Sequence, residues 1–156
     1  MTLPLRFATY LKDGTERYGA VVGDGIIDLS SRFAAEYPTL REVIAAGAMP
    51  RLADAAAARA ADHRLGEIAL RPPIPAPEKI ICIGVNYPDR NAEYKDGQDA
   101  PKYPSMFMRT PRSFVGHGAP LVRPQISQQL DYEGELVLVI GKAGRHIAEK
   151  NALDHI

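Results

Sequence analysis

The chain has almost no cysteine and no excess of charge of either sign. The first observation bears on disulfides and the second on the classes of binding partner that the protein can have. Its single cysteine, Cys82, excludes an internal disulfide, and the apolar residues around it predict a small core side chain. Lysine plus arginine equals aspartate plus glutamate, 19 of each, so no net field favours nucleic acid or an acidic membrane. No apolar run approaches membrane-spanning length, and the N-terminus lacks a basic-then-apolar leader pattern. We therefore expect a cytoplasmic protein that binds neither nucleic acid nor membranes.

A proline-rich stretch divides the 156 residues, a length that suits one ordinary domain or two small ones. Residues 72–78 form a stiff, extended connector that fits neither a helix nor a central strand. We expect residues 1–71 to form a small α+β domain and residues 79–156 to belong to a second, mainly β domain.

The first domain is predicted as a β-meander followed by helices. Two Asp-Gly pairs between Leu5 and Leu29 are strong turn signals, and they separate three short apolar strands. Thr39 is typical of a helix N-cap, because a glutamate follows three residues later and a glycine closes the segment. An alanine-rich helix is expected from Leu52 to His63, and a short strand from Glu67 to Leu70.

In the second domain, the β-branched run from Lys79 to Val85 predicts a strand. Residues 86–118 are polar and rich in proline, glycine and aromatics, with at most one helical turn. A loop of that length is usually functional or disordered, and its aromatic and methionine content favours an active-site loop or lid. A terminal amphipathic helix is expected from Ala148 to Ile156.

The most informative stretch runs from Asp131 to Lys142, where acidic residues lead into an apolar run that predicts a buried strand. Asp131, Glu133 and Glu135 alternate, so a strand would point them the same way, with neighbours under ~7 Å apart. Two charges at that spacing repel by roughly 2.4 kcal/mol at an effective dielectric of 20, and a hard divalent cation relieves this. The alternative is that the three acids are only the solvated end of a strand. A small calcium module is disfavoured, because the sequence has no D-x-D-x-D-G loop.

Several motifs in the right order and spacing give the second half a family resemblance. They are Gly84-Val85-Asn86-Tyr87, Ala92-Glu93, Pro104-x-x-Phe107-x-Arg109, Pro120 to Pro124, and Asp131 to Leu136 followed by Val139-Ile140-Gly141-Lys142. In these residues the chain from Lys79 to Ile156 resembles the fumarylacetoacetate hydrolase superfamily, and the first domain resembles the small N-terminal domain of many members.

This resemblance implies an α+β protein whose mainly β catalytic domain, of rolled mixed sheets, begins at residue 79 and follows a β-meander-plus-helices domain. It further implies a homodimer that binds Mg²⁺ or Mn²⁺ through Glu133 and Glu135. Its substrate would be a small 2-oxo acid or a 1,3-dicarbonyl compound, as in aromatic-compound catabolism. The reaction would be isomerisation, decarboxylation or carbon–carbon hydrolysis. The resemblance places Asn86 and Tyr87 at the substrate.

Three departures from the family pattern bear on the chemistry. Arg90 stands where the family often has a catalytic histidine, while the accompanying Glu93 is retained, and arginine cannot act as a general base at neutral pH. Arg109 replaces a common lysine and offers a forked donor set for a substrate carboxylate. The remaining acidic metal ligand of the family is expected beyond Ile156, so that the chain is an apparently truncated catalytic domain. Two alternatives stay open: Arg90 and Glu93 form a surface ion pair, or the chain is a non-catalytic remnant or binding subunit.

Overall fold

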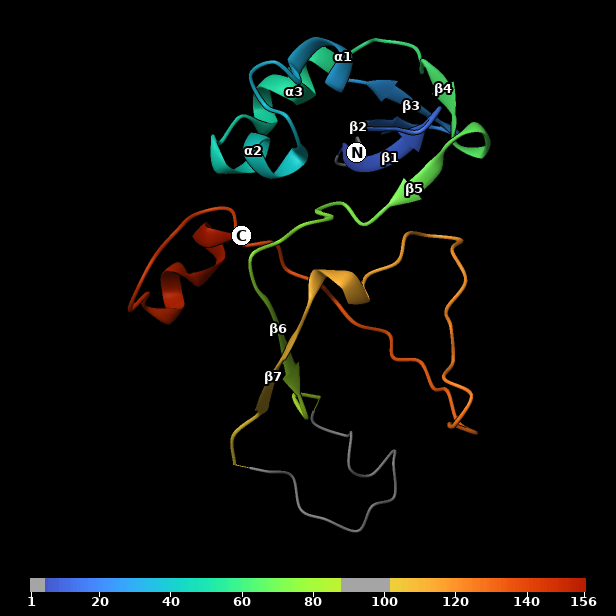
Figure 1. Cartoon of the computed structure of the whole chain (residues 1–156). Helices are drawn as coiled ribbons and strands as arrows, with labels where there is room; N and C mark the ends of the chain where they lie inside the picture. The colour runs from blue at the N-terminus through green and yellow to red at the C-terminus, as the bar shows by residue number, and fades with distance from the viewer. Residues whose placement is uncertain (1–4, 88–101) are drawn as a thin grey trace. The chain divides into compact units, whose positions relative to one another are not determined.

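The computed structural model of the chain describes residues 5–87 and 102–156 (Figure 1). Its contacts divide it into two units, one formed by residues 1–74 with 115–156 and the other by residues 75–114. No helix in the described ranges is long and apolar enough to cross a membrane.

A five-stranded antiparallel sheet forms the first part of the chain. Its strands are β1 (Arg6–Lys12), β2 (Thr15–Val22), β3 (Gly25–Asp28), β4 (His63–Arg64) and β5 (Ala69–Arg71), in the spatial order β4-β3-β2-β1-β5. The predicted meander is confirmed. Asp13 and Gly14 both have positive φ, 50° and 75°, as the tight hairpin turn between β1 and β2 requires. The second turn lies one residue earlier than expected, because Gly23 takes the left-handed conformation with φ 58°.

Three short helices, α1 (Ser30–Phe33), α2 (Leu40–Ala45) and α3 (Met49–Ala56), cover one face of this sheet (Figure 1). The predicted cap of α2 is confirmed: the Thr39 hydroxyl accepts a hydrogen bond from the Arg41 amide, and the Glu42 carboxylate accepts one from the Thr39 amide. The core lies between the sheet and the helices. It consists mainly of Tyr18, Ala20, Ile27 and Leu29 from the strand side and Phe33, Leu40, Val43, Leu52 and Ala56 from the helices.

The predicted helix from Leu52 to His63 is wrong in its second half, since α3 ends at Ala56. Ala58 takes a left-handed φ of 58°, which breaks the helix, and the Asp62 amide then donates to the Ile26 carbonyl at 2.8 Å. His63 pairs with Ile26 in β4 instead of closing a helix. The exposed alanines after Ala56 bury nothing as a helix, so pairing with the open edge of β3 overrides their intrinsic preference. The strand expected at residues 67–70 is β5, shifted to Ala69–Arg71 behind a 3₁₀ turn, η1 (Leu65–Glu67).

The second unit is built on a two-stranded antiparallel ladder. Strand β6 (Ile80–Gly84) confirms the predicted strand and pairs with β7 (Ser105–Arg109), in the register Ile80 with Arg109 and Gly84 with Ser105. The expectation of an active-site loop or lid without strands over residues 86–118 is therefore wrong for β7, and a 3₁₀ turn, η2 (Pro111–Ser113), follows that strand. The open backbone groups of β6 supply a partner that no local signal in the sequence reveals. Cys82 is half-buried instead of fully enclosed, because this ladder has no layer on both faces within the described residues.

The expected strand from Asp131 to Lys142 does not form. Residues 131–140 are irregular and exposed, with Leu136 at 86% and Val137 at 82% of their full accessibility. A strand gains its stability from a paired neighbour, and among the strands of the described ranges none runs beside this stretch. The terminal helix is present as a 3₁₀ helix, η3 (Glu149–His155), whose His155 carbonyl accepts from the Gly141 amide at 2.8 Å.

Candidate functional site

The paired glutamates of the acidic stretch are freely accessible. Neither Glu133 nor Glu135 makes a hydrogen bond or ion pair with another described residue, and the added Cβ of a residue at Gly134 would meet no atom within 4 Å. Asp131 differs from them, because its carboxylate accepts a hydrogen bond from the neighbouring Tyr132 amide at 2.8 Å. The two glutamates therefore keep all their oxygen lone pairs available to a ligand.

The donor set matches a hard divalent cation in kind. Carboxylate oxygens suit Mg²⁺ or Mn²⁺ better than zinc, and two of them repel each other less when a cation lies between them. Glu133 and Glu135 can supply two positions of an octahedral oxygen shell. Within residues 5–87 and 102–156, however, no group of three or more His, Cys, Asp or Glu side chains gathers to complete one. The pair thus matches a metal site in the chemistry of its oxygen donors, but the described residues do not assemble such a site around it.

Asn86 and Tyr87 follow an unusual backbone conformation at the end of β6. Val85 has a φ of 57°, in the left-handed region that β-branched residues rarely adopt. Holding such a residue there costs on the order of 1–3 kcal/mol, and strain of this kind is concentrated at binding and catalytic sites. It redirects the chain at Gly84-Val85-Asn86-Tyr87, a motif that carries the family resemblance. Both Asn86 and Tyr87 are exposed beyond this bend.

Arg109 lies at the other end of the β6–β7 ladder. It is opposite Ile80, whereas Asn86 and Tyr87 follow Gly84, four residues further along β6. Four steps of an antiparallel strand span roughly 13 Å, so the ladder alone does not bring Arg109 to Asn86 and Tyr87. The guanidinium carbon of Arg109 lies 4.6 Å from the centroid of the Phe107 ring, a cation–π contact that orients its donors.

The other two sequence-predicted site residues, Arg90 and Glu93, lie outside the described residues. Both hypotheses for them, a role at the substrate and a surface ion pair, stay predictions.

Sequence reasoning missed a buried ionic network in the first part of the chain. Asp28 is only 5% exposed, and its carboxylate accepts hydrogen bonds from Arg17 Nη1 at 2.6 Å, Ser30 Oγ at 2.6 Å and the Ser31 amide at 3.1 Å. Burial raises the pKa of Asp28, but the hydrogen bonds from Ser30 and Arg17 outweigh it and hold the pKa below its ordinary value. Burial also raises the pKa of Tyr10, whose hydroxyl finds no hydrogen-bond partner among the described residues. Ser30 and Ser31 lie within three residues of Asp28, but the sequence does not show that Arg17, on the neighbouring strand β2, reaches the same carboxylate.

Comparison with known proteins gives consistent results. Residues 79–156 match the family model described as fumarylacetoacetate (FAA) hydrolase C-terminal. The oxaloacetate tautomerase YisK of Bacillus subtilis is 44% identical over 97 residues, which are 60% of this chain and 32% of that protein. The mitochondrial oxaloacetate tautomerase fahd2 of Xenopus laevis is 38% identical over 144 residues, which are 90% of this chain and 44% of that protein.

A solved structure extends the similarity to nearly the whole chain. The fumarylacetoacetate hydrolase of Exiguobacterium antarcticum superposes with a TM-score of 0.74 at 33% identity, covering 97% of this chain and 52% of that one. This chain thus spans between about a third and about half of the length of these proteins. The superposition confirms the fold class that the sequence predicted, α+β with a β-meander followed by helices.

Proposed function

The chain belongs to the fumarylacetoacetate hydrolase family, and from that premise we propose that it is part of an enzyme interconverting the keto and enol forms of a 2-oxo dicarboxylic acid. One observation carries the proposal: two oxaloacetate tautomerases, from a bacterium and a vertebrate, match it at 44% and 38% identity. Decarboxylation and carbon–carbon hydrolysis belong to the same chemical class, because all three reactions pass through an enolate.

Glu133 and Glu135 would hold a divalent cation, Mg²⁺ or Mn²⁺. Both carboxylates are exposed and unpaired within the described ranges, which supports this role. A divalent cation supplies Lewis-acid stabilisation of the negative charge that develops when an oxo acid enolises. Further ligands would come from groups outside those described.

Arg109 would bind a substrate carboxylate. Its guanidinium is already oriented by the Phe107 ring, and a guanidinium can donate two parallel hydrogen bonds to one carboxylate. Asn86 and Tyr87, presented by the strained bend at Val85, would contact the same substrate. The β6–β7 ladder alone does not bring these residues to Arg109, so a shared substrate would require the chain beyond the bend at Val85 to turn back along the ladder.

The residue at position 90 favours isomerisation over hydrolysis. Arginine stays protonated and cannot activate water, whereas Glu93 can move a proton if its surroundings raise its pKa. Arg90 would then serve as a second carboxylate clamp. A dicarboxylic oxo acid, with two carboxylates, matches a site that has two arginines and no histidine at this position.

The proposal is tested by following the ultraviolet absorbance of enol-oxaloacetate in the presence of the purified protein with Mg²⁺ or Mn²⁺. We expect a rate of ketonisation above the spontaneous rate that disappears with a chelator, and less pyruvate formation than tautomerisation. Glu133→Gln and Glu135→Gln should each return the ketonisation rate to the spontaneous rate. Asp131→Asn is the matched control, because it removes a charge from the same stretch at a residue that is not expected to bind the metal.

Titration with Mn²⁺, followed by electron paramagnetic resonance of the free ion, separates this proposal from the alternative of a non-catalytic remnant. Micromolar binding that Glu133→Gln weakens supports the metal site. Absent or millimolar binding, unchanged in that variant, supports the remnant and contradicts the proposal. Homodimeric assembly is part of the same proposal, and sedimentation of the purified protein measures it.

A further inference from the structure

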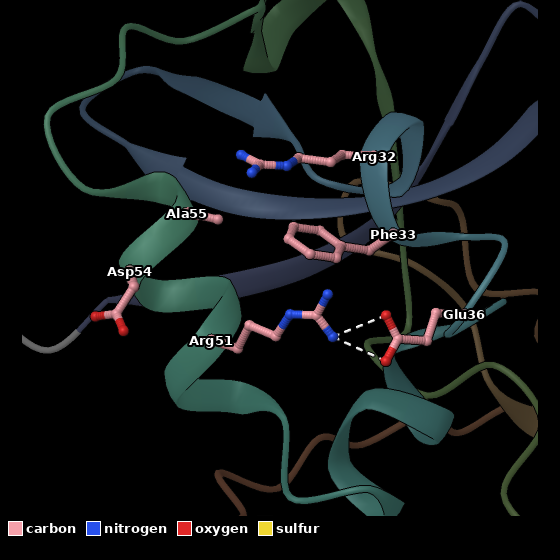
Figure 2. A pocket seen from close by; sticks show the side chains of 6 residues that line it. All are labelled: Arg32, Phe33, Glu36, Arg51, Asp54 and Ala55. Carbon is pink, nitrogen blue, oxygen red and sulfur yellow. Dashed lines mark hydrogen bonds and ion pairs between the residues drawn. The ribbon is translucent and has the colours of Figure 1, made fainter.

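The first part of the chain contains a hollow that has no place in the proposed reaction. It is a surface hollow that is largely open to solvent, with a volume of about 490 Å³, and its lining residues come from α1, the turn after it and α3: Arg32, Phe33, Glu36, Arg51, Asp54 and Ala55 (Figure 2). Small-molecule sites commonly have volumes of about 300–1,000 Å³, so the hollow is large enough for a compact ligand.

Two arginines in this hollow are held against one aromatic ring. The guanidinium carbons of Arg32 and Arg51 lie 5.3 Å and 5.1 Å from the centroid of the Phe33 ring. Figure 2 shows the ring between the two guanidinium groups. Phe33 is only 5% exposed and is anchored in the core, so both arginines rest on a rigid support. Each therefore loses less side-chain entropy on binding a ligand than a free surface arginine does.

The hydrogen-bonding capacity of the two arginines is largely unused. The Arg51 side chain donates its hydrogen bonds to described residues from Nη1: two go to Glu36, at 2.8 Å and 2.7 Å, and one to the Tyr37 hydroxyl at 3.1 Å. Its Nε and Nη2 are bonded to no described residue. The side chain of Arg32 makes neither a hydrogen bond nor an ion pair with any residue in the described part of the chain, and its guanidinium lies against the Phe33 ring. Glu36 is thus neutralised, whereas donors of both arginines stay open.

We propose that this hollow binds a small organic monocarboxylate. Arg32 would donate two hydrogen bonds to the carboxylate, and the positive charge of Arg51, on the other side of the Phe33 ring, would add attraction at longer range. The small side chain of Ala55 leaves room for the apolar body of the ligand.

The charge balance of the hollow selects against a more highly charged anion. Arg32 and Arg51 contribute two positive charges, and Glu36 and Asp54 contribute two negative ones. The carboxylate of Asp54 is turned away from the ring in Figure 2, but its charge still opposes a second negative group on a ligand. A single carboxylate therefore fits better than a phosphate dianion.

The test is a titration of the complete ¹⁵N-labelled chain with benzoate, followed by amide chemical shifts, and a parallel titration with inorganic phosphate. We expect saturable shifts in α1 and α3 with benzoate and at least tenfold weaker binding of phosphate. Because charged hydrogen bonds are lost, Arg32→Gln should weaken benzoate binding by about tenfold or more, and Arg32→Lys by less.

Two further variants make the result specific. Ala55→Leu fills the hollow without changing its charge and should also remove binding, whereas Arg6→Gln removes a positive charge from β1 and should leave it unchanged. Either Arg32 variant keeps the fold intact, because this side chain is exposed. The inference is overturned if benzoate causes no saturable shift, if phosphate binds as tightly, or if Arg32→Gln and Ala55→Leu bind benzoate like the parent chain.

Discussion

Asp28→Ala tests whether burial, and not the mere presence of an ion pair, decides how much a charge contributes to this fold. The side chain of Asp28 is 7% exposed and that of its partner Arg17 is 35% exposed. Removing one partner of a fully buried pair typically costs about 3–5 kcal/mol, because the other charge is left without compensation. Here Arg17 can turn toward water, so we expect a smaller loss, about 2–3 kcal/mol, mostly from the hydrogen bonds of Ser30 and Ser31 that lose their charged acceptor.

Glu36→Ala is the matched comparison. The pair of Glu36 with Arg51 has similar distances, 2.7 Å and 2.8 Å, but its side chains are about half exposed. Water competes for both charges, and we expect no measurable loss of stability. Urea unfolding followed by near-ultraviolet circular dichroism of the buried tyrosines measures both variants. Equal losses in the two variants would refute the reasoning, since they would show that burial makes no difference.

Two other predictions concern the same network and the strained bend. Because the pKa of Asp28 is held below its ordinary value, its contribution to stability is fully present above about pH 4 and is lost as the pH falls through the lowered value. Unfolding midpoints measured from pH 7 down to pH 2 should therefore fall less steeply for Asp28→Asn than for the parent chain, and parallel curves would contradict this. At Val85, substitution by glycine removes the steric cost of φ 57°. We therefore expect slower amide hydrogen exchange in β6, corresponding to a free energy of opening that is higher by up to about 1 kcal/mol. If the bend positions Asn86 and Tyr87, the same variant should also show a lower tautomerase rate. Faster exchange in β6 of Val85→Gly would show that the valine side chain matters more than the strain.

Local signals made much of the first domain predictable. The two turns of the meander and the capping box of Thr39 depend on residues within four positions of each other, and the sequence displays them directly. The end of α3 could not be read in this way, because it depends on hydrogen bonds between the segment before His63 and Ile26, more than thirty residues earlier. Strand β7 was missed for the same reason: its partner, β6, is separated from it by a long segment.

The identity of the candidate site residues was readable from the sequence, whereas their geometry was not. Alternation and family resemblance single out Glu133 and Glu135, yet the strand that would align them is absent, because a run of apolar residues becomes a strand only beside a paired neighbour. The register that separates Arg109 from Asn86 is likewise a property of the ladder and not of either segment. Nothing in the sequence predicts the left-handed φ of Val85, because β-branched residues rarely adopt that conformation.

The lengths of the outermost strands have a consequence for how the first domain behaves at high concentration. Strands β4 and β5, which close the two sides of the meander sheet, have only two and three residues. Edge strands this short offer few free amides and carbonyls to a neighbouring molecule, so they disfavour pairing of the sheet with the sheet of a second copy. The short edge strands of the meander sheet therefore protect it against polymerisation.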